Sequence, residues 1–152
     1  MANTQSMCTS FMQEVLVATH NFTTGTGDTF KAALYLASAT MNASTTAYTS
    51  TGEVTGTNYT AGGVNVTNGT SPLSTNTSAT AGVAYWTPTA SLTYTNVTLT
   101  TAFDAVLIYN SSKSNKAVSV HTFGSQTVTA GTFTLTMPSN TTSTALIRLS
   151  TT

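Results

Sequence analysis

Threonine fills about a quarter of this chain, while Asp, Glu, Lys and Arg together make up only 5% of it. Side chains that branch at Cβ suit the pleated surface of a strand and lose rotamer freedom in a helix. Ionisable side chains are what acid–base catalysis and metal binding depend on. The composition therefore predicts a β-rich structural or binding protein and argues against an enzyme.

Size and net charge narrow the class of protein further. The 152 residues fit one domain, and the formal net charge is zero with only four Lys and Arg residues, so no basic surface for nucleic acid is expected. The apolar runs are far shorter than the ~20 residues of a membrane span. The polar start of the chain lacks the pattern of a secretory signal, and the single Cys8 fits synthesis in a reducing cytoplasm. We expect neither a nucleic-acid nor a membrane partner.

Short runs of alternating apolar residues predict a mainly β fold, an antiparallel, jelly-roll-like β-sandwich of about eight strands. Residues 103–109 are apolar on both faces, which is typical of a central strand, and a change of face near Asn96 indicates a bulge. Turn residues at 110–115 predict a hairpin loop. The segments expected as strands are 30–36, 64–66, 83–87, 92–100, 103–109, 117–123, 126–129, 132–137 and 144–149.

One helix is expected near the N-terminus. Between Ser10 and Thr19, apolar residues recur at helical spacing, and Ser10 with Gln13 forms a capping-box pattern. A helix this short needs a surface to pack on. The expected organisation is an N-terminal arm, residues 1–9, followed by one β-sandwich domain, residues 10–152, that includes the helix at 10–20.

Two long segments rich in Thr, Ser, Ala and Gly, residues 38–63 and 67–80, are expected to be loops. A short helical turn is expected near Tyr48 to Glu53. Uncharged Thr-rich strands are poorly protected against edge-to-edge pairing, so the sheet edges should be covered by loops or by neighbouring subunits. Both loops, and the segment 1–22, are candidate contact surfaces.

The sequence offers little for catalysis or for a metal or cofactor site. The four acids lie far apart in the sequence, at Glu14, Asp28, Glu53 and Asp104. The first three occupy a helix, a turn and a loop, where carboxylates are usually solvated. Asp104 interrupts an apolar strand and is expected to bond backbone N–H groups or to pair with Lys31 or Arg148. The two imidazoles, His20 and His121, have too few companions for a zinc site, and we expect no catalytic, cofactor-binding or metal-ligating residues.

The aromatic residues leave two interpretations open. Side chains from the strands could line a sugar-binding groove, but aromatic residues in strands are more often core; they are Tyr85, Trp86, Tyr94 and Tyr109. A cluster of exposed aromatics would also serve a protein interface. The residues expected to lie at an interface are Phe11, Met12, Tyr48, Tyr59 and Trp86.

Several blocks of the sequence resemble small virion structural proteins of tailed bacteriophages. The blocks are Gly27–Tyr35, Ala47–Val54, Gly56–Gly63, Ala105–Asn110 and Asn115–Val118. The resemblance covers residues 8 to 137 and includes no chemical signature. It implies a non-enzymatic component of a virus particle, and it transfers no functional residue to this chain.

These observations predict a capsid decoration, or cement, protein on the outer surface of a phage head. It would be made in the bacterial host cytoplasm, would bridge neighbouring major capsid subunits, and would contact the major capsid protein and copies of itself. The alternative is a tail or fibre component, including a carbohydrate-binding module for the host surface. An enzyme would need two of the four acids to converge.

Overall fold

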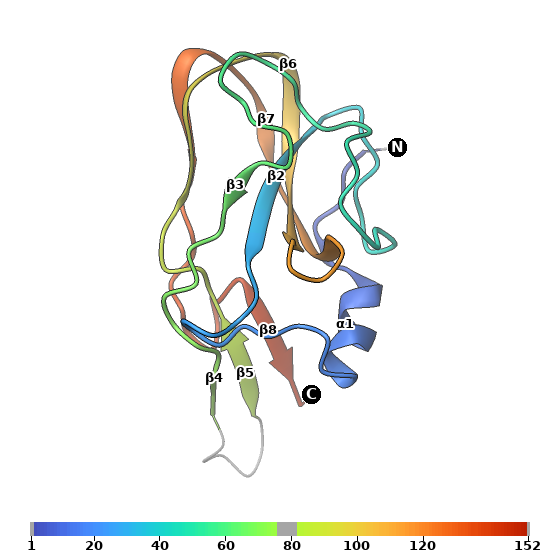
Figure 1. Ribbon diagram of the computed structural model, residues 1–152, viewed down its shortest axis with the longest axis vertical. Coiled ribbons are helices and arrows are strands. Elements are labelled where there is room, and N and C mark those ends of the chain that lie inside the picture. Colours follow the sequence, from blue (N-terminus) through green and yellow to red (C-terminus); the bar gives the residue numbers. More distant parts are fainter. Residues whose placement is uncertain (1, 76–81, 152) are drawn as a thin grey trace.

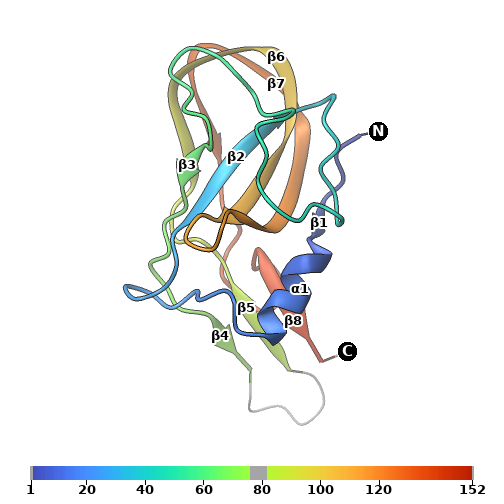
Figure 2. The same ribbon diagram turned by 45° about the vertical axis from the view of Figure 1, so that its right-hand side comes forward.

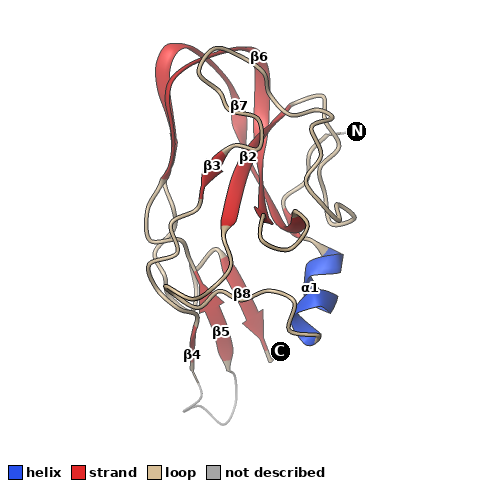
Figure 3. Cartoon of the chain, viewed as in Figure 1, coloured by secondary structure: helices blue, strands red, loops and turns tan. Residues whose placement is uncertain are grey.

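Two antiparallel sheets and one short helix make up the chain. The computed structural model describes residues 2–75 and 82–151. The elements are β1 Ser6–Met7, α1 Thr9–Leu16, β2 Phe30–Leu36, β3 Val64–Asn65, β4 Leu73–Ser74, β5 Val83–Trp86, β6 Leu92–Asn110, β7 Lys116–Leu135 and β8 Ile147–Ser150 (Figures 1 and 3). The large sheet has the order β1-β7-β6-β2-β3 and the small one the order β4-β5-β8. The expected antiparallel β-sandwich of about eight strands with one short N-terminal helix is confirmed.

A long hairpin, β6 and β7, dominates the large sheet. The segments that we expected as five separate strands are continuous here, because β-bulges absorb the irregular residues without ending the pairing. One register shift falls between Tyr94 and Val97, where Asn96 has φ 51°, so the expected bulge is confirmed. Figures 1 and 2 show both strands curving together over one end of the molecule. The two halves of the hairpin then pack on each other, with the rings of Phe103 and Phe133 5.0 Å apart.

The core lies around β2 and the half of this hairpin that is next to its turn at residues 111–115. Residues 105–110 of β6 are all buried, and β6 lies between β7 and β2, as expected for a central strand. Tyr94 lies in the other half of the hairpin, far from its turn, and donates its hydroxyl proton to the carbonyl oxygen of Ala32 on β2 at 2.8 Å. This bond between residues 62 positions apart joins the curved end of the hairpin to the main sheet.

A loop covers the edge of β2. Strand β3 pairs only with Lys31 and Ala32. Beyond that point the backbone of Val54 donates to Leu34, and Leu36 donates to Gly52, so residues 52–54 take the place of a neighbouring strand. The edge is thus protected by a loop, as we expected for strands without charged residues. The helical turn expected at Tyr48 to Glu53 was wrong, because Ala47 and Glu53 form isolated β-bridges instead.

The small sheet lies at the opposite end of the molecule from the curved part of the hairpin (Figures 1 and 2). Its strand β4 falls within residues 67–80, which we expected to be loop throughout. Residues 76–80 of that segment lie outside the described ranges. Strand β5 lies between β4 and β8 and pairs with both. Its Trp86 pairs with Ile147 of β8, and both residues line the site described below.

The N-terminal segment is hydrogen-bonded to the sandwich. Ser6 pairs with Val120 at the edge of β7, and the backbone of Thr4 donates to Met41 at 2.8 Å. The side chain of Asn3 donates to Asp104 at 2.6 Å. Asp104 therefore binds Asn3, and the pairing with Lys31 or Arg148 that we expected was wrong. Of the arm expected at residues 1–9, the described part lies along the sheet.

Helix α1 begins and ends earlier than the sequence pattern indicated. Cys8 is the N-cap residue, and its side chain makes no capping hydrogen bond, so the capping box predicted from Ser10 and Gln13 was wrong. The Ser10 hydroxyl is buried and has no hydrogen-bond partner among the described residues. The helix ends at Leu16 because Ala18 adopts the left-handed conformation, with φ 55°.

Candidate interaction surface

Helix α1 exposes apolar side chains to solvent. Its buried residues are Phe11 and Glu14. On the opposite side, Leu16 is 85% exposed, Val17 at the C-cap is 62% exposed, and Met12, one turn before Leu16, is 45% exposed. Burial of one leucine side chain is worth about 1.5–3 kcal/mol, so an exposed row of this kind marks a surface that a partner can cover.

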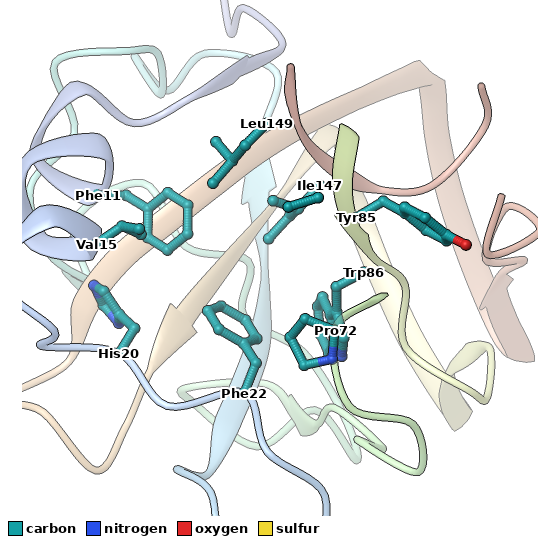
Figure 4. Close-up of a pocket in the computed structure, with 10 residues that line it drawn as sticks. Phe11, Val15, His20, Phe22, Pro72, Tyr85, Trp86, Ile147 and Leu149 are labelled. Atoms are coloured by element: carbon teal, nitrogen blue, oxygen red, sulfur yellow. The ribbon is translucent and has the colours of Figure 1, made fainter. Parts of the chain in front are cut away.

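An apolar hollow of about 180 Å³ lies between α1 and the small sheet (Figure 4). Phe11 and Val15 approach from α1, Ile147 and Leu149 from β8, and Trp86 from β5. The other lining residues come from the loops on either side and from β5; they are His20, Phe22, Pro72, Ala84 and Tyr85. The lining is almost entirely hydrocarbon, which suits a small aliphatic or aromatic group.

Exposed apolar residues continue across the rim of this hollow. Leu149 lines it and is 39% exposed. Leu73 on β4 is 45% exposed but lies on the other face of the small sheet, because it pairs with Tyr85 while Leu149 pairs with Ala84. Helix α1 and the small sheet, which carry these exposed residues, both lie at the lower end of the molecule in Figure 1. We call the apolar surface of the helix together with the hollow the α1 face; it consists of Met12, Leu16, Val17, Leu149 and the hollow.

Trp86 closes the inner side of the hollow and cannot reach a partner. It is 2% exposed, and its indole N–H donates to Asn68 Oδ1 at 3.0 Å and to the carbonyl of Thr70 at 3.1 Å. Its ring lies 4.8 Å from that of Phe22. Phe11 is equally buried, at 1% exposure. Burial therefore argues against direct contact of Phe11 or Trp86 with a partner, whereas the contact role of Met12 stays a prediction.

Tyr48 and Tyr59, the other two residues expected at an interface, lie elsewhere, around a buried carboxylate. Glu53 accepts the hydroxyl of Tyr48 at 2.7 Å, the hydroxyl of Tyr59 at 2.8 Å and the backbone N–H of Gly62 at 2.7 Å. Burial, with the nearby charge of Glu53, raises the pKa of both phenols above its ordinary value. These hydroxyls bind within the fold, and Glu53, expected to be solvated, is buried.

The strand aromatics do not form a sugar-binding groove. The hydroxyls of Tyr94 and Tyr109 bind the backbone carbonyls of Ala32 and Gly62, and both rings are buried in the core. Trp86 is buried as well, and Tyr85 is half-buried in the lining of the hollow. For three of these four residues, the interpretation as core is confirmed.

Several ionisable groups are held in structural contacts. Burial, with the charge of Glu14 adding to it, raises the pKa of the Cys8 thiol to about 12, so the sulfur stays protonated and unreactive. Burial lowers the pKa of His121 to about 4, and its ring lies 2.9 Å from the Ser119 hydroxyl. Glu14 is buried against Lys116 and His20, so the expectation of a solvated carboxylate was wrong. Within residues 2–75 and 82–151 no three His, Cys, Asp or Glu side chains gather to hold a metal ion.

Sequence reasoning anticipated part of the α1 face. Met12 was expected at an interface, and Leu16 and Val17 lie within residues 1–22, a candidate contact segment, although neither was singled out. Leu149 was not expected there. The sequence did contain a signal for this face. Met12 and Leu16 directly follow Phe11 and Val15, so apolar residues cover more of the helix surface than one buried side needs.

Comparisons with known proteins leave this surface to be interpreted on its own chemistry. No family model, no curated protein and no solved structure matched the chain. None of the helices in the described residues is long and apolar enough to cross a membrane.

Proposed function

We propose that this chain is a non-enzymatic structural protein of a bacteriophage virion. It acts as a capsid decoration protein that binds the outer surface of the head and bridges neighbouring major capsid subunits. The observation that carries the proposal is the α1 face, where Leu16 is 85% exposed beside an apolar hollow. The resemblance of the sequence blocks to small virion proteins supports the choice of partner.

The low charge of the chain suits such a role. Only 5% of the residues are charged, and a protein near zero net charge associates readily. A decoration protein works through many modest contacts repeated by the symmetry of the head. In this proposal, the major capsid protein covers the α1 face, and a side chain from it enters the hollow beside Val15 and Leu149.

Binding to heads tests the proposal directly. Heads assembled from the major capsid protein of the same phage are mixed with the purified chain, and binding is measured by co-sedimentation. Leu16→Ser should weaken binding at least tenfold, because burial of one leucine is worth about 1.5–3 kcal/mol. Thr129→Ala, at an exposed position on β7, serves as the matched control and should bind like the unmodified chain.

Cryo-electron microscopy of complete particles separates the two virion locations. Density for the chain on the head, repeated with head symmetry, supports the proposal. Density confined to the tail would overturn it in favour of the tail or fibre alternative. Deletion of residues 1–9 is a poorer test, because Ser6 and Met7 form an edge strand and Asn3 binds Asp104, so the deletion would disturb the fold as well as any contact.

A further inference from the structure

Half of the charged residues of this chain gather at one place. The chain has four acids and four bases, and the cluster includes two of each together with one histidine: Glu14, Asp28, Lys113, Lys116 and His20. Glu14 Oε1 accepts from Lys116 at 2.5 Å, and Glu14 Oε2 lies 2.8 Å from His20 Nε2. Lys113 lies 3.7 Å from Asp28. In a chain so poor in charge, this concentration indicates a specific task.

Asn110 connects the two halves of the cluster. Its side chain is fully buried at the end of β6, and its Nδ2 donates to Asp28 at 2.7 Å and lies 3.0 Å from His20 Nδ1. The Asn110 Oδ1 accepts from the backbone of Ser112, which fixes the orientation of the amide. His20 Nδ1 is therefore an acceptor, and the ring directs its Nε2 proton toward Glu14. The resulting chain of contacts runs from Asp28 through Asn110 and His20 to Glu14 and Lys116.

The cluster is a principal attachment of α1 to the sandwich. The helix has eight residues, too few to be stable alone. Its buried residues are Phe11 and Glu14, and Val15 packs partly buried against the core. At its start, the backbone N–H groups of Cys8 and Thr9 donate to Val118 and Ala43. Among these attachments, only the Glu14 carboxylate changes its charge in acid.

We propose that this cluster is an acid-sensitive latch, in which protonation of Glu14, aided by that of Asp28, releases α1 while the large sheet stays folded. The latch is a property of the chain alone, whether or not the chain binds a capsid. Release would open the hollow, because Phe11 and Val15 form its wall on the side of the helix.

The direction of the pH dependence follows from the groups that face each carboxylate. Burial raises the pKa of Glu14, but hydrogen bonds from Lys116 and His20 outweigh burial and lower it below its ordinary value. For Asp28, burial is likewise outweighed by hydrogen bonds from the Asn110 side chain and the Asn21 N–H and by the charge of Lys113, which together lower its pKa. A lowered pKa in the folded state stabilises docking at neutral pH, and this contribution is lost as the pH falls below the ordinary carboxyl values. Cys8, which also faces Glu14, stays neutral throughout.

Hydrogen exchange of the full chain tests the latch. Between pH 6 and pH 3, the amides of residues 9–16 should lose at least tenfold in protection and become unprotected, while those of residues 103–110 in β6 remain protected. In Glu14→Gln, which keeps the shape of the side chain but not the charge, the protection of residues 9–16 should already be at least tenfold lower at pH 6.

The matched control is Glu53→Gln. Glu53 is a carboxylate of similar burial, and it lies in the loop that covers the edge of β2. It should leave the exchange of residues 9–16 unchanged at pH 6. The latch is overturned if Glu14→Gln protects residues 9–16 as well as the unmodified chain does. It is also overturned if residues 9–16 and 103–110 of the unmodified chain become unprotected at the same pH, a measurement that needs no variant.

Discussion

Tyr59 donates its hydroxyl proton to the carboxylate of Glu53, with 2.8 Å between the two oxygens. The same hydroxyl accepts the backbone N–H of Leu34 at 3.0 Å. A tyrosine side chain thus completes the hydrogen bonding of β2 at the place where β3 has already ended. Because Glu53 also binds Tyr48 and Gly62, one buried carboxylate organises the loop that protects this sheet edge.

Removing the Tyr59 hydroxyl should destabilise the fold. In Tyr59→Phe, the Leu34 N–H loses its acceptor and Glu53 loses a donor, and each buried unpaired group costs about 1–3 kcal/mol. We expect the free energy of unfolding to fall by about 2–3 kcal/mol in urea titrations. Tyr85→Phe, at the half-buried lining of the hollow, is the control and should change it by less than about 0.5 kcal/mol. Equal values for the two variants would contradict the role assigned to Tyr59.

Gly63 lies where its backbone almost touches β2. Its φ is 74°, and a Cβ atom placed there would overlap the carbonyl of Ala32. Gly25 has a similar φ of 80°, but a Cβ atom there meets nothing within 4 Å. The two glycines share the same conformational requirement and differ in the space around them.

Gly63→Ala should therefore cost far more than Gly25→Ala. The left-handed conformation alone costs an alanine about 1–2 kcal/mol, which is the expected effect at Gly25. At Gly63 the loop must also move away from β2, and we expect a total above about 4 kcal/mol, in the range of severe point mutations. Calorimetric melting of both variants checks this, and a difference below about 1 kcal/mol would show that the loop at Gly63 yields freely.

The strand pattern was readable from the sequence because one face of each strand is buried. Residues 30–36 were predicted with the observed bounds, and 103–109 were correctly placed in the centre of the sheet. The breaks expected between the strands 117–123, 126–129 and 132–137 were wrong, since residues 124–125 and 130–131 lie within β7. A turn residue ends a strand only when the partner strand ends too, and the pairing of β6 with β7 is not visible in either segment alone.

The buried carboxylates show what short-range patterns miss. Glu14 was read as solvated because a charged residue on a short helix usually is. Its partner Lys116 lies 102 positions further along the chain, so only the folded structure brings the two together. Glu53 is different, because Tyr48 and Tyr59 flank it within six positions, and a carboxylate between two nearby tyrosines could have been read as their common acceptor.

His121 lies in β7, with its ring 2.9 Å from the Ser119 hydroxyl. It lines two hollows; one is shared with β8, where Arg148 is a charged neighbour, and the other with the loop at residues 136–138. Burial lowers its pKa to about 4, whereas an unfolded chain has a histidine pKa of about 6.5. The folded chain therefore resists protonation of this ring over more than two pH units.

The unfolded state binds a proton at His121 more readily than the folded state does, so acid favours unfolding. The contribution of His121 is fully present above about pH 6.5 and is lost as the pH falls toward 4, by about 3 kcal/mol at most. We expect urea midpoints of the unmodified chain to drop across this window, and those of His121→Gln to change much less. Thr122→Ser, at the next residue of β7, is the control, and its urea midpoints should depend on pH as those of the unmodified chain do. The latch at Glu14 acts below this pH window. If the urea midpoints of His121→Gln fall between pH 6.5 and 4.5 as much as those of the unmodified chain, the loss of stability belongs to another group.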